Sequence, residues 1–181
     1  SSNIGQLFVD HNLDIRKYTP SIENIVNIIG GDIGRPVYHL SHNLKYARLV
    51  EDIQYVNNTS HEVEQEVETN EGRYFLMRII PYLKRDGNKD GVVISFVDVT
   101  TLRTLSSVVN GVLNSSLNSI MAFRTVRDEN NQIKDFNWTL LNKKTEEMLG
   151  ESSANLINSS VLSSLPILRK SGLFKKFVAV V

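Results

Sequence analysis

The chain of 181 residues contains no cysteine. A disulfide-stapled secreted scaffold is therefore excluded, together with any cysteine-ligated zinc or iron–sulfur centre and any thiol nucleophile. The sequence also lacks an apolar run of about 18 residues or more, which a membrane-spanning helix needs, and it shows no signal-peptide pattern. We therefore expect no membrane insertion and a cytoplasmic location.

An excess of charge of either sign is absent as well. Lys and Arg together number 20, and so do Asp and Glu, so no net field attracts nucleic acid or an anionic membrane. On this ground we expect no nucleic-acid partner. The hydrophobic fraction of 41% is typical of globular chains and suffices for one core or two small ones.

The common enzyme motifs are also missing. There is no Gly-x-Ser-x-Gly, no His-Glu-x-x-His and no cofactor fingerprint, so we expect no catalytic residue. A row of alternating glutamates consists of Glu62, Glu64, Glu66 and Glu68. Alternate residues of a strand lie about 7 Å apart, too far to share one metal ion, so we interpret this row as a solvated face paired with Arg73 or Arg78 across a hairpin.

The chain is predicted to open with a hairpin of two short strands, over residues 4–9 and 13–19. Alternation would place Leu13, Ile15 and Lys17 on one face of the second strand.

Helical spacing follows the hairpin. A helix is expected over residues 20–29, with Thr19 as its N-cap, Pro20 in its first turn and Gly30 and Gly31 as its stop. A second, amphipathic helix is expected over residues 40–56.

The next segment is predicted to form a meander of three antiparallel strands. The strands are expected over residues 62–68, 74–82 and 92–97, with tight turns at 70–72 and 86–91. The central strand is apolar on both faces, and Leu76 and Ile80 lie on the second face. A sheet covered on one face only should be polar on the other, so we expect a terminal helix or a partner subunit to cover the outer face.

After Thr100 the pattern becomes that of a short coiled coil. Leu102, Leu105, Val109 and Val112 follow a three-four-three spacing. Together with Leu76 and Ile80, these four residues are our candidates for a dimer interface, and we expect a homodimer.

The second half repeats the order of the first. Strands are expected at 119–123 and 133–141, followed by a helix over 143–149 that Gly150 stops, and then by further short helices. No counterpart of the meander follows. Because such a unit leaves core and strand edges uncovered, we expect it to be poorly ordered alone or to dock onto another chain.

Several segments together resemble the PAS family. These are residues 4–10, 13–20, 32–36, 72–82 and 91–100, the last ending in Asp98-Val99-Thr100. The resemblance implies an α+β fold, namely a five-stranded antiparallel sheet with helices on one face. It divides the chain into a PAS sensory domain (1–100), a linker helix (101–116) and the N-terminal half of a second PAS-like domain (117–181).

More narrowly, the chain resembles PAS domains in bacterial fusions of a chemotaxis-type methylesterase and methyltransferase, which often continue into further PAS domains or a histidine kinase. This implies a non-catalytic sensing and dimerisation module that acts on adjacent domains of a larger signal-transduction protein. A structural dimerisation spacer that senses nothing is the alternative.

The resemblance also implies a cavity that can hold a ligand. The flavin-adduct and hydroxycinnamoyl chromophores need a cysteine and are excluded, and no other cofactor is required. A haem would need an axial ligand, for which His39 and His42 are the candidates; the alternative is that both are surface or loop histidines.

Overall fold

The computed structural model describes residues 4–84, 87 and 89–181. The chain forms two compact units, residues 1–104 and 105–181, which are treated separately below. The expected turn at 86–91 lies partly outside the described residues, because Asp86 and Asn88 are among those left undescribed.

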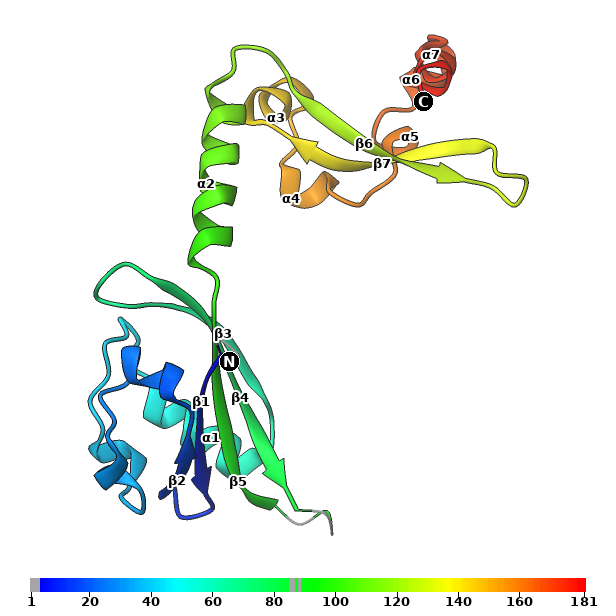
Figure 1. The fold of residues 1–181 in the computed structure, drawn as a ribbon. Coiled ribbons are helices and arrows are strands. Elements are labelled where there is room, and N and C mark those ends of the chain that lie inside the picture. The colour runs from blue at the N-terminus through cyan, green and yellow to red at the C-terminus, as the bar shows by residue number, and fades with distance from the viewer. Residues whose placement is uncertain (1–3, 85–86, 88) are drawn as a thin grey trace. The chain divides into compact units, whose positions relative to one another are not determined.

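The first unit is built on a five-stranded antiparallel sheet, which confirms the predicted fold class (Figure 1). Its strands are β1 (Ile4–Asp10), β2 (Ile15–Tyr18), β3 (Val63–Glu68), β4 (Tyr74–Leu83) and β5 (Lys89–Asp98). They lie in the order β2-β1-β5-β4-β3. Between β2 and β3 come the 3-10 helices η1 (Pro20–Asn24), η2 (Gly30–Asp32) and η3 (Val37–His39) and the helix α1 (Leu49–Thr59).

The core lies between the helical segment and one face of the sheet. Alternate strand residues such as Leu7, Met77 and Ile94 point into it and meet Ile22 and Ile53 from the helical side. All five are almost completely buried. This period-two alternation fixes which sheet face is the inner one.

The two helices expected in the middle of the unit are shorter than predicted. The first is only the 3-10 helix η1, and the Thr19 hydroxyl does not cap it. Instead, this hydroxyl accepts a hydrogen bond from the Gln6 backbone N–H (2.8 Å) and donates one to the Ile4 carbonyl (3.1 Å). Gly30 and Gly31 begin the next 3-10 helix, η2, rather than ending a helix.

The second expected helix begins at Leu49 and not at residue 40. The preceding backbone bonds to other segments, because the Asn43 N–H donates to the Ile25 carbonyl and the Lys45 N–H to the Glu68 carbonyl. Backbone groups committed to these partners cannot also form helical bonds. This pairing, which joins residues far apart in sequence, overrides the helical spacing.

The outer face of the sheet carries two apolar rows with a polar row between them. One apolar row is Ile4, Val97 and Leu76, and the other is Phe8, Val93 and Ile80. The polar row is Gln6, Ser95 and Arg78. The two candidates Leu76 and Ile80 are half-buried, on separate rows.

Helix α2 (Thr100–Ser115) covers the segment where the linker helix was expected. The second unit then contains β6 (Met121–Arg127), β7 (Ile133–Leu141) and the helices α3 (Lys143–Leu149), α4 (Ser153–Leu156), α5 (Val161–Ser164), α6 (Ile167–Lys170) and α7 (Leu173–Ala179). Strands β6 and β7 form an antiparallel pair. The first of these strands begins at Met121 and extends to Arg127, four residues beyond its predicted end.

The second unit has a core of its own. Trp138 is fully buried and its ring lies 4.9 Å from that of Phe123, with Phe136 beside them. Asn142 caps α3 by accepting a hydrogen bond from the Thr145 N–H, and Gly150 ends the helix with a positive φ, as expected. Two strands followed by short helices is also the order of elements in residues 4–59.

Candidate functional site

The space between sheet and helices is almost completely filled. Its cavity has a volume of about 10 Å³ and is lined by Leu7, Val26, Val37, Leu40, His42, Leu49, Val50, Ile53, Ile94 and Phe96. A volume of this size is about enough for one water molecule. A haem does not fit in it without a rearrangement of the core.

Of the two candidate haem ligands, His42 alone lines this cavity. Its Nδ1 atom is buried and has no hydrogen-bond partner among the described residues, so one water in the cavity would satisfy it. His39 is exposed, and its ring contacts that of Tyr38 instead.

A polar pair, half-buried Tyr46 and buried Asp52, holds α1 beside the cavity. Tyr46 donates its hydroxyl hydrogen bond to the Asp52 carboxylate, and the Arg48 guanidinium lies 3.5 Å from the same carboxylate. Burial and the hydrogen bond to Asp52 raise the pKa of Tyr46 to about 12. The phenol therefore stays a donor at neutral pH, and it fixes α1 to the segment before it.

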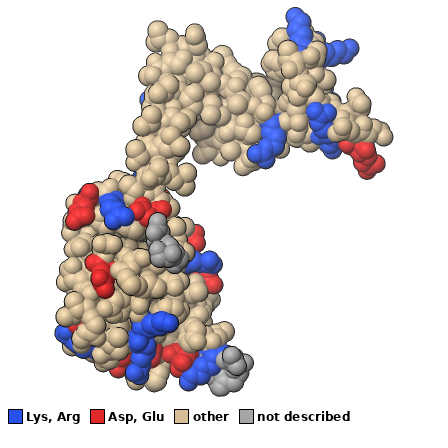
Figure 2. All heavy atoms as spheres, in the orientation of Figure 1, with Lys and Arg blue, Asp and Glu red and all other residues tan. Residues whose placement is uncertain are grey.

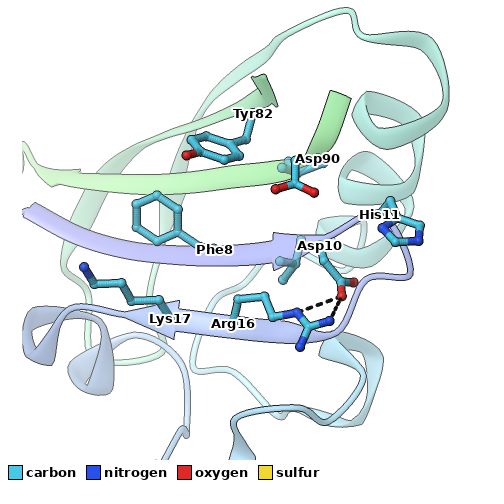
Figure 3. A pocket seen from close by; sticks show the side chains of 9 residues that line it. Phe8, Asp10, His11, Arg16, Lys17, Tyr82 and Asp90 are labelled. Atoms are coloured by element: carbon cyan, nitrogen blue, oxygen red, sulfur yellow. Dashed lines mark hydrogen bonds and ion pairs between the residues drawn. The ribbon is translucent and has the colours of Figure 1, made fainter. Parts of the chain in front are cut away.

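A much larger hollow lies on the outer face of the sheet, at the end where β1 and β4 finish (Figure 3). Its volume is about 600 Å³, which is within the range of small-molecule sites. We call it the outer-face pocket. It is lined by Phe8, Val9, Asp10, His11, Arg16, Lys17, Tyr82, Asp90 and Val92.

Two β-bulges shape the outer-face pocket. On β2, Ile15 pairs with Val9 and Lys17 with Phe8, so Arg16 is the extra residue. On β5, Gly91 pairs with Tyr82 and Lys89 with Leu83, so Asp90 is the extra residue. Each bulge bends its strand and redirects a side chain.

The bulge at Arg16 overturns the predicted face of Lys17. An unbroken alternation would place Lys17 beside Ile15, but Ile15 is fully buried whereas Lys17 is exposed. The inserted residue shifts the register by one, and so Lys17 lies on the outer face beside Phe8.

Gly91 allows β1 and β5 to approach closely at this end of the sheet. Its φ is +145°, and a Cβ atom built on it would lie 2.0 Å from the Val9 carbonyl oxygen and 2.7 Å from the Asp10 Cα. Only glycine fits between these backbones.

The acidic groups of the pocket have partners within the first unit. Asp10 accepts hydrogen bonds from the Arg16 Nε (2.8 Å) and from the Asn12 and Asp14 backbone N–H groups. Burial tends to raise the pKa of Asp10, but these hydrogen bonds hold the pKa below its ordinary value. Asp90 lies 3.0 Å from the Lys84 ammonium.

The Lys17 ammonium differs from these groups. Among the described residues, none forms an ion pair or hydrogen bond with it. The Phe8 and Tyr82 rings stand edge to face nearby, 6.4 Å apart between centroids. The pocket thus combines an aromatic wall with one uncompensated cation (Figure 3).

The junction between the sheet and α2 is a second candidate site. Asp98 accepts a hydrogen bond from the Thr100 N–H (2.9 Å) and pairs with Arg73 (2.6 Å). The Thr100 hydrogen bonds, and then Arg73, lower the pKa of Asp98 despite partial burial. One turn later, Arg103 pairs with Glu66 and lies over the Tyr74 ring, 4.7 Å from its centroid.

The glutamate row pairs with Arg78, one of the two partners predicted for it. Arg78 pairs with Glu62 (2.8 Å) and lies 3.8 Å from Glu64, as expected for a cross-strand neighbour. Arg73 pairs with Asp98 rather than with a glutamate. Within the described ranges, no three His, Asp or Glu side chains come close enough to hold a metal ion.

The four candidate dimer residues on α2 are all exposed in the single chain. Leu102, Leu105, Val109 and Val112 have exposed fractions of 69%, 60%, 45% and 65%. They form one stripe along the helix.

Figure 2 shows acidic and basic side chains interspersed over the visible face of the first unit. In the part of the chain that is described, no helix has the length and apolar character to cross a membrane.

Sequence reasoning did not find the outer-face pocket. Two of its charged residues, Arg16 and Asp90, are the extra residues of bulges, and simple alternation does not predict a bulge. The signal available was Gly91, which breaks an otherwise apolar strand sequence, since a strand glycine often marks a bulge or a close backbone approach.

Comparison with known proteins places these features in a family. A 112-residue stretch is 32% identical to an uncharacterised 104.1 kDa protein in the hypE 3' region of Rhodobacter capsulatus, and the match covers 60% of this chain and 12% of that protein. The chain therefore spans about an eighth of the length of this relative.

Solved structures that this chain resembles include three proteins. A sensory box sensor histidine kinase from Vibrio cholerae is 18% identical, with a TM-score of 0.42 over 54% of this chain and 82% of that one. The VqmA dimer of Vibrio cholerae is 17% identical, with a TM-score of 0.44 over 56% and 50%. A PAS domain from Colwellia psychrerythraea is 12% identical, with a TM-score of 0.39 over 55% and 88%.

The family model described as PAS domain matches residues 1–100, more than half of the chain, and these residues include the whole five-stranded sheet. The chain therefore belongs to the PAS domain family.

Proposed function

We propose that the first unit is a signal-sensing module that changes the state of helix α2 and, through it, of adjacent domains. The observation that carries this proposal is the junction of α2 with the sheet. The first turn of α2 is bonded to the ends of β4 and β5 through Thr100, whose hydroxyl bonds to both backbone groups of Tyr74.

A distortion of the sheet would reach α2 through three contacts. Asp98 holds the first N–H of the helix, Thr100 bonds to Tyr74, and Arg103 pairs with Glu66 of β3. Because each contact joins α2 to a different strand, a relative shift of β3, β4 and β5 cannot leave all three unchanged. Such a shift is the two-state element that a relay needs.

We further propose that two copies of α2 pair through the stripe Leu102, Leu105, Val109 and Val112. This stripe repeats at coiled-coil spacing and is exposed in the single chain. Pairing would remove it from water and would give the relay a defined output.

The test of the relay is amide exchange along α2 in an Asp98→Ala variant. Loss of the side chain removes the acceptor of the Thr100 N–H and the partner of Arg73, and lost caps cost about 1 kcal/mol. We expect exchange over the first two turns of α2 to rise about fivefold. Glu71→Gln, an exposed carboxylate of the β3–β4 turn, is the matched control and should leave α2 unchanged.

An α2 exchange profile that is equal in the Asp98→Ala variant and the parent chain would contradict the relay. In that case the sheet and the helix are joined without being energetically coupled.

A structural dimerisation spacer is the second candidate, and the filled interior favours it. A cavity of about 10 Å³ leaves no room for an internal ligand. Mass spectrometry of material extracted from the native protein separates the two functions, because a specific small molecule that co-purifies would exclude the spacer.

The wider setting is also a proposal. We infer a cytoplasmic signal-transduction protein in which a methylesterase–methyltransferase fusion or a histidine kinase accompanies this module, and in which residues 117–181 begin a second PAS-like unit. The order of strands and helices in the second unit supports the last point. The flanking sequence of the full-length gene product tests all three parts of this proposal: the cytoplasmic location, the accompanying catalytic domains and the second PAS-like unit.

A further inference from the structure

We propose that the outer-face pocket binds a small aromatic carboxylate, with the ring against Phe8 and Tyr82 and the carboxylate on Lys17. The claim that this site senses a ligand rests on the function proposed above. The claim that it binds one rests only on the structure of the outer-face pocket.

The first argument is size. The outer-face pocket has about 600 Å³ of space, whereas the interior cavity has about 10 Å³. A ligand of one ring and a short acidic side chain fits the first and not the second. Of these two cavities, the outer-face pocket is therefore the one that can hold such a molecule.

The second argument is the construction of the pocket. Two bulges, at Arg16 and Asp90, lie at the same end of the sheet and both extra residues line the pocket. Bulges are enriched beside binding sites, because they re-aim side chains. Without the first bulge, Lys17 would not share a face with Phe8.

The third argument is charge. Asp10 is compensated by Arg16, and Asp90 by Lys84. Lys17 is left without a counter-charge among the described residues. An anion bound near Lys17, beside the Phe8 and Tyr82 rings, would supply the missing counter-charge.

The fourth argument is the aromatic wall itself. The Phe8 and Tyr82 rings are nearly perpendicular, at 84°, and Tyr82 is 47% exposed. A third ring can stack on either of them, and such contacts add to the free energy gained from burial alone. An aliphatic acid of equal length loses this gain.

Binding at this place can act on the relay. Phe8 pairs across the sheet with Val93 of β5, and Val93 pairs with Ile80 of β4. The far ends of these two strands, at Tyr74 of β4 and Asp98 of β5, both form hydrogen bonds with Thr100 in the first turn of α2. A ligand that packs against Phe8 of β1 and Tyr82 of β4 therefore contacts the sheet next to β5, and it can shift β4 and β5, the two strands that bond to α2.

The experiment uses the full 181-residue chain and three probes: 3-phenylpropionate, its neutral amide and hexanoate. Titration is followed by isothermal calorimetry and by the backbone amide signals of Phe8, Lys17 and Val93. We expect 3-phenylpropionate to bind with a Kd of about 1 mM, as its size allows, and the amide and hexanoate to bind at least about fivefold more weakly.

The deciding variant is Lys17→Met, which keeps an unbranched apolar side chain and removes the charge. It should weaken the acid about fivefold to tenfold and leave the amide unchanged. Lys134→Met is the matched control, because Lys134 is also an exposed strand lysine and lies in the second unit. Phe8→Leu keeps an apolar side chain in the sheet, removes the ring and should weaken both aromatic probes.

Absence of saturable binding overturns the proposal, and so does equal binding of hexanoate or an affinity that Lys17→Met leaves unchanged. Either of the last two outcomes would indicate that the pocket is a general apolar surface of the kind that a protein partner covers, and not a site for an aromatic carboxylate. If the acid binds as expected but α2 exchange does not respond to it, the site stands and the sensory function fails. If the acid does not bind but Asp98→Ala loosens α2, the relay stands without this ligand.

Discussion

The replacement of Gly91 by alanine tests the geometry on which the outer-face pocket depends. The new Cβ would lie 2.0 Å from the Val9 carbonyl oxygen, 2.7 Å from the Asp10 Cα and 2.8 Å from the Asp10 carbonyl carbon. All three are backbone atoms, so no side chain can rotate to make room. Strands β1 and β5 must separate at this end.

The cost has two parts. A residue with a side chain at φ +145° is strained by about 1–3 kcal/mol, and overpacking adds about 1–3 kcal/mol. We therefore expect Gly91→Ala to lower the free energy of unfolding of the first unit by about 4 kcal/mol. This is a large part of the roughly 5–15 kcal/mol that stabilises a typical domain.

Gly72→Ala is the matched control. Gly72 also has a positive φ, +80°, but a Cβ atom there meets nothing within 4 Å. Only backbone strain of about 1–2 kcal/mol applies. The difference between the two variants isolates the close approach of β1 and β5.

The urea unfolding of the two units can be followed separately in this chain, because different aromatic residues report on each. The six tyrosines, Tyr18, Tyr38, Tyr46, Tyr55, Tyr74 and Tyr82, all lie in the first unit, and the single tryptophan, Trp138, lies in the second. Tyrosine signals should show a midpoint about 1–3 M lower in Gly91→Ala than in Gly72→Ala, while the Trp138 transition stays constant. Equal midpoints would refute the close approach of the two strands and the pocket built on it.

Three further predictions concern the dimer, the pH response and the second unit. Charged residues at Leu105 and Val109 should yield a monomer, because the dimer would bury two apolar side chains from each of two copies, and losing about 1 kcal/mol for each of the four shifts the dimer Kd about a thousandfold; an unchanged mass by light scattering would count against pairing through α2. Because the pKa of Asp10 is lowered on folding from 3.8, its stabilising contribution is present above that value and is lost as the pH falls through the lower folded pKa; Asp10→Asn should flatten this acid-side decline in urea titrations, and an equally steep decline would exclude Asp10 as its source. Amides 120–141 should exchange rapidly in a monomer, because this unit pairs only two strands, and strong protection there would show that it is stable alone.

Much of the sheet could be predicted because its strands are short alternating or apolar runs that turn residues separate. The meander 63–98 combines alternation with clear turns, and its three strands match the expected ranges closely. The helix Lys143–Leu149 was equally clear, since Gly150 marks its end, and the structure adds Asn142 as the cap at its start. Local signals sufficed in these two segments, where the backbone partners are close in sequence.

Residues 20–48 could not be predicted in the same way. Their apolar residues recur at helical spacing, yet the backbone bonds to β2 and to the β3–β4 turn, as the Gly34 N–H does to the Ile15 carbonyl. Such long-range partners leave no local pattern. For the same reason the face of Lys17 was missed, because a bulge is a property of two strands together.

The most direct test of the account is a spin-label distance across the α2 pair. The chain has no cysteine, so Ser107→Cys provides a single label, on the side of α2 opposite Leu105 and Val109. We predict one narrow distance distribution in the parent chain and a broadened or shifted one when Arg103→Ala removes the contacts with Glu66 and Tyr74. A chain without intermolecular dipolar coupling, or a distribution that Arg103→Ala leaves unaltered, would contradict a sensory sheet coupled to a paired helix.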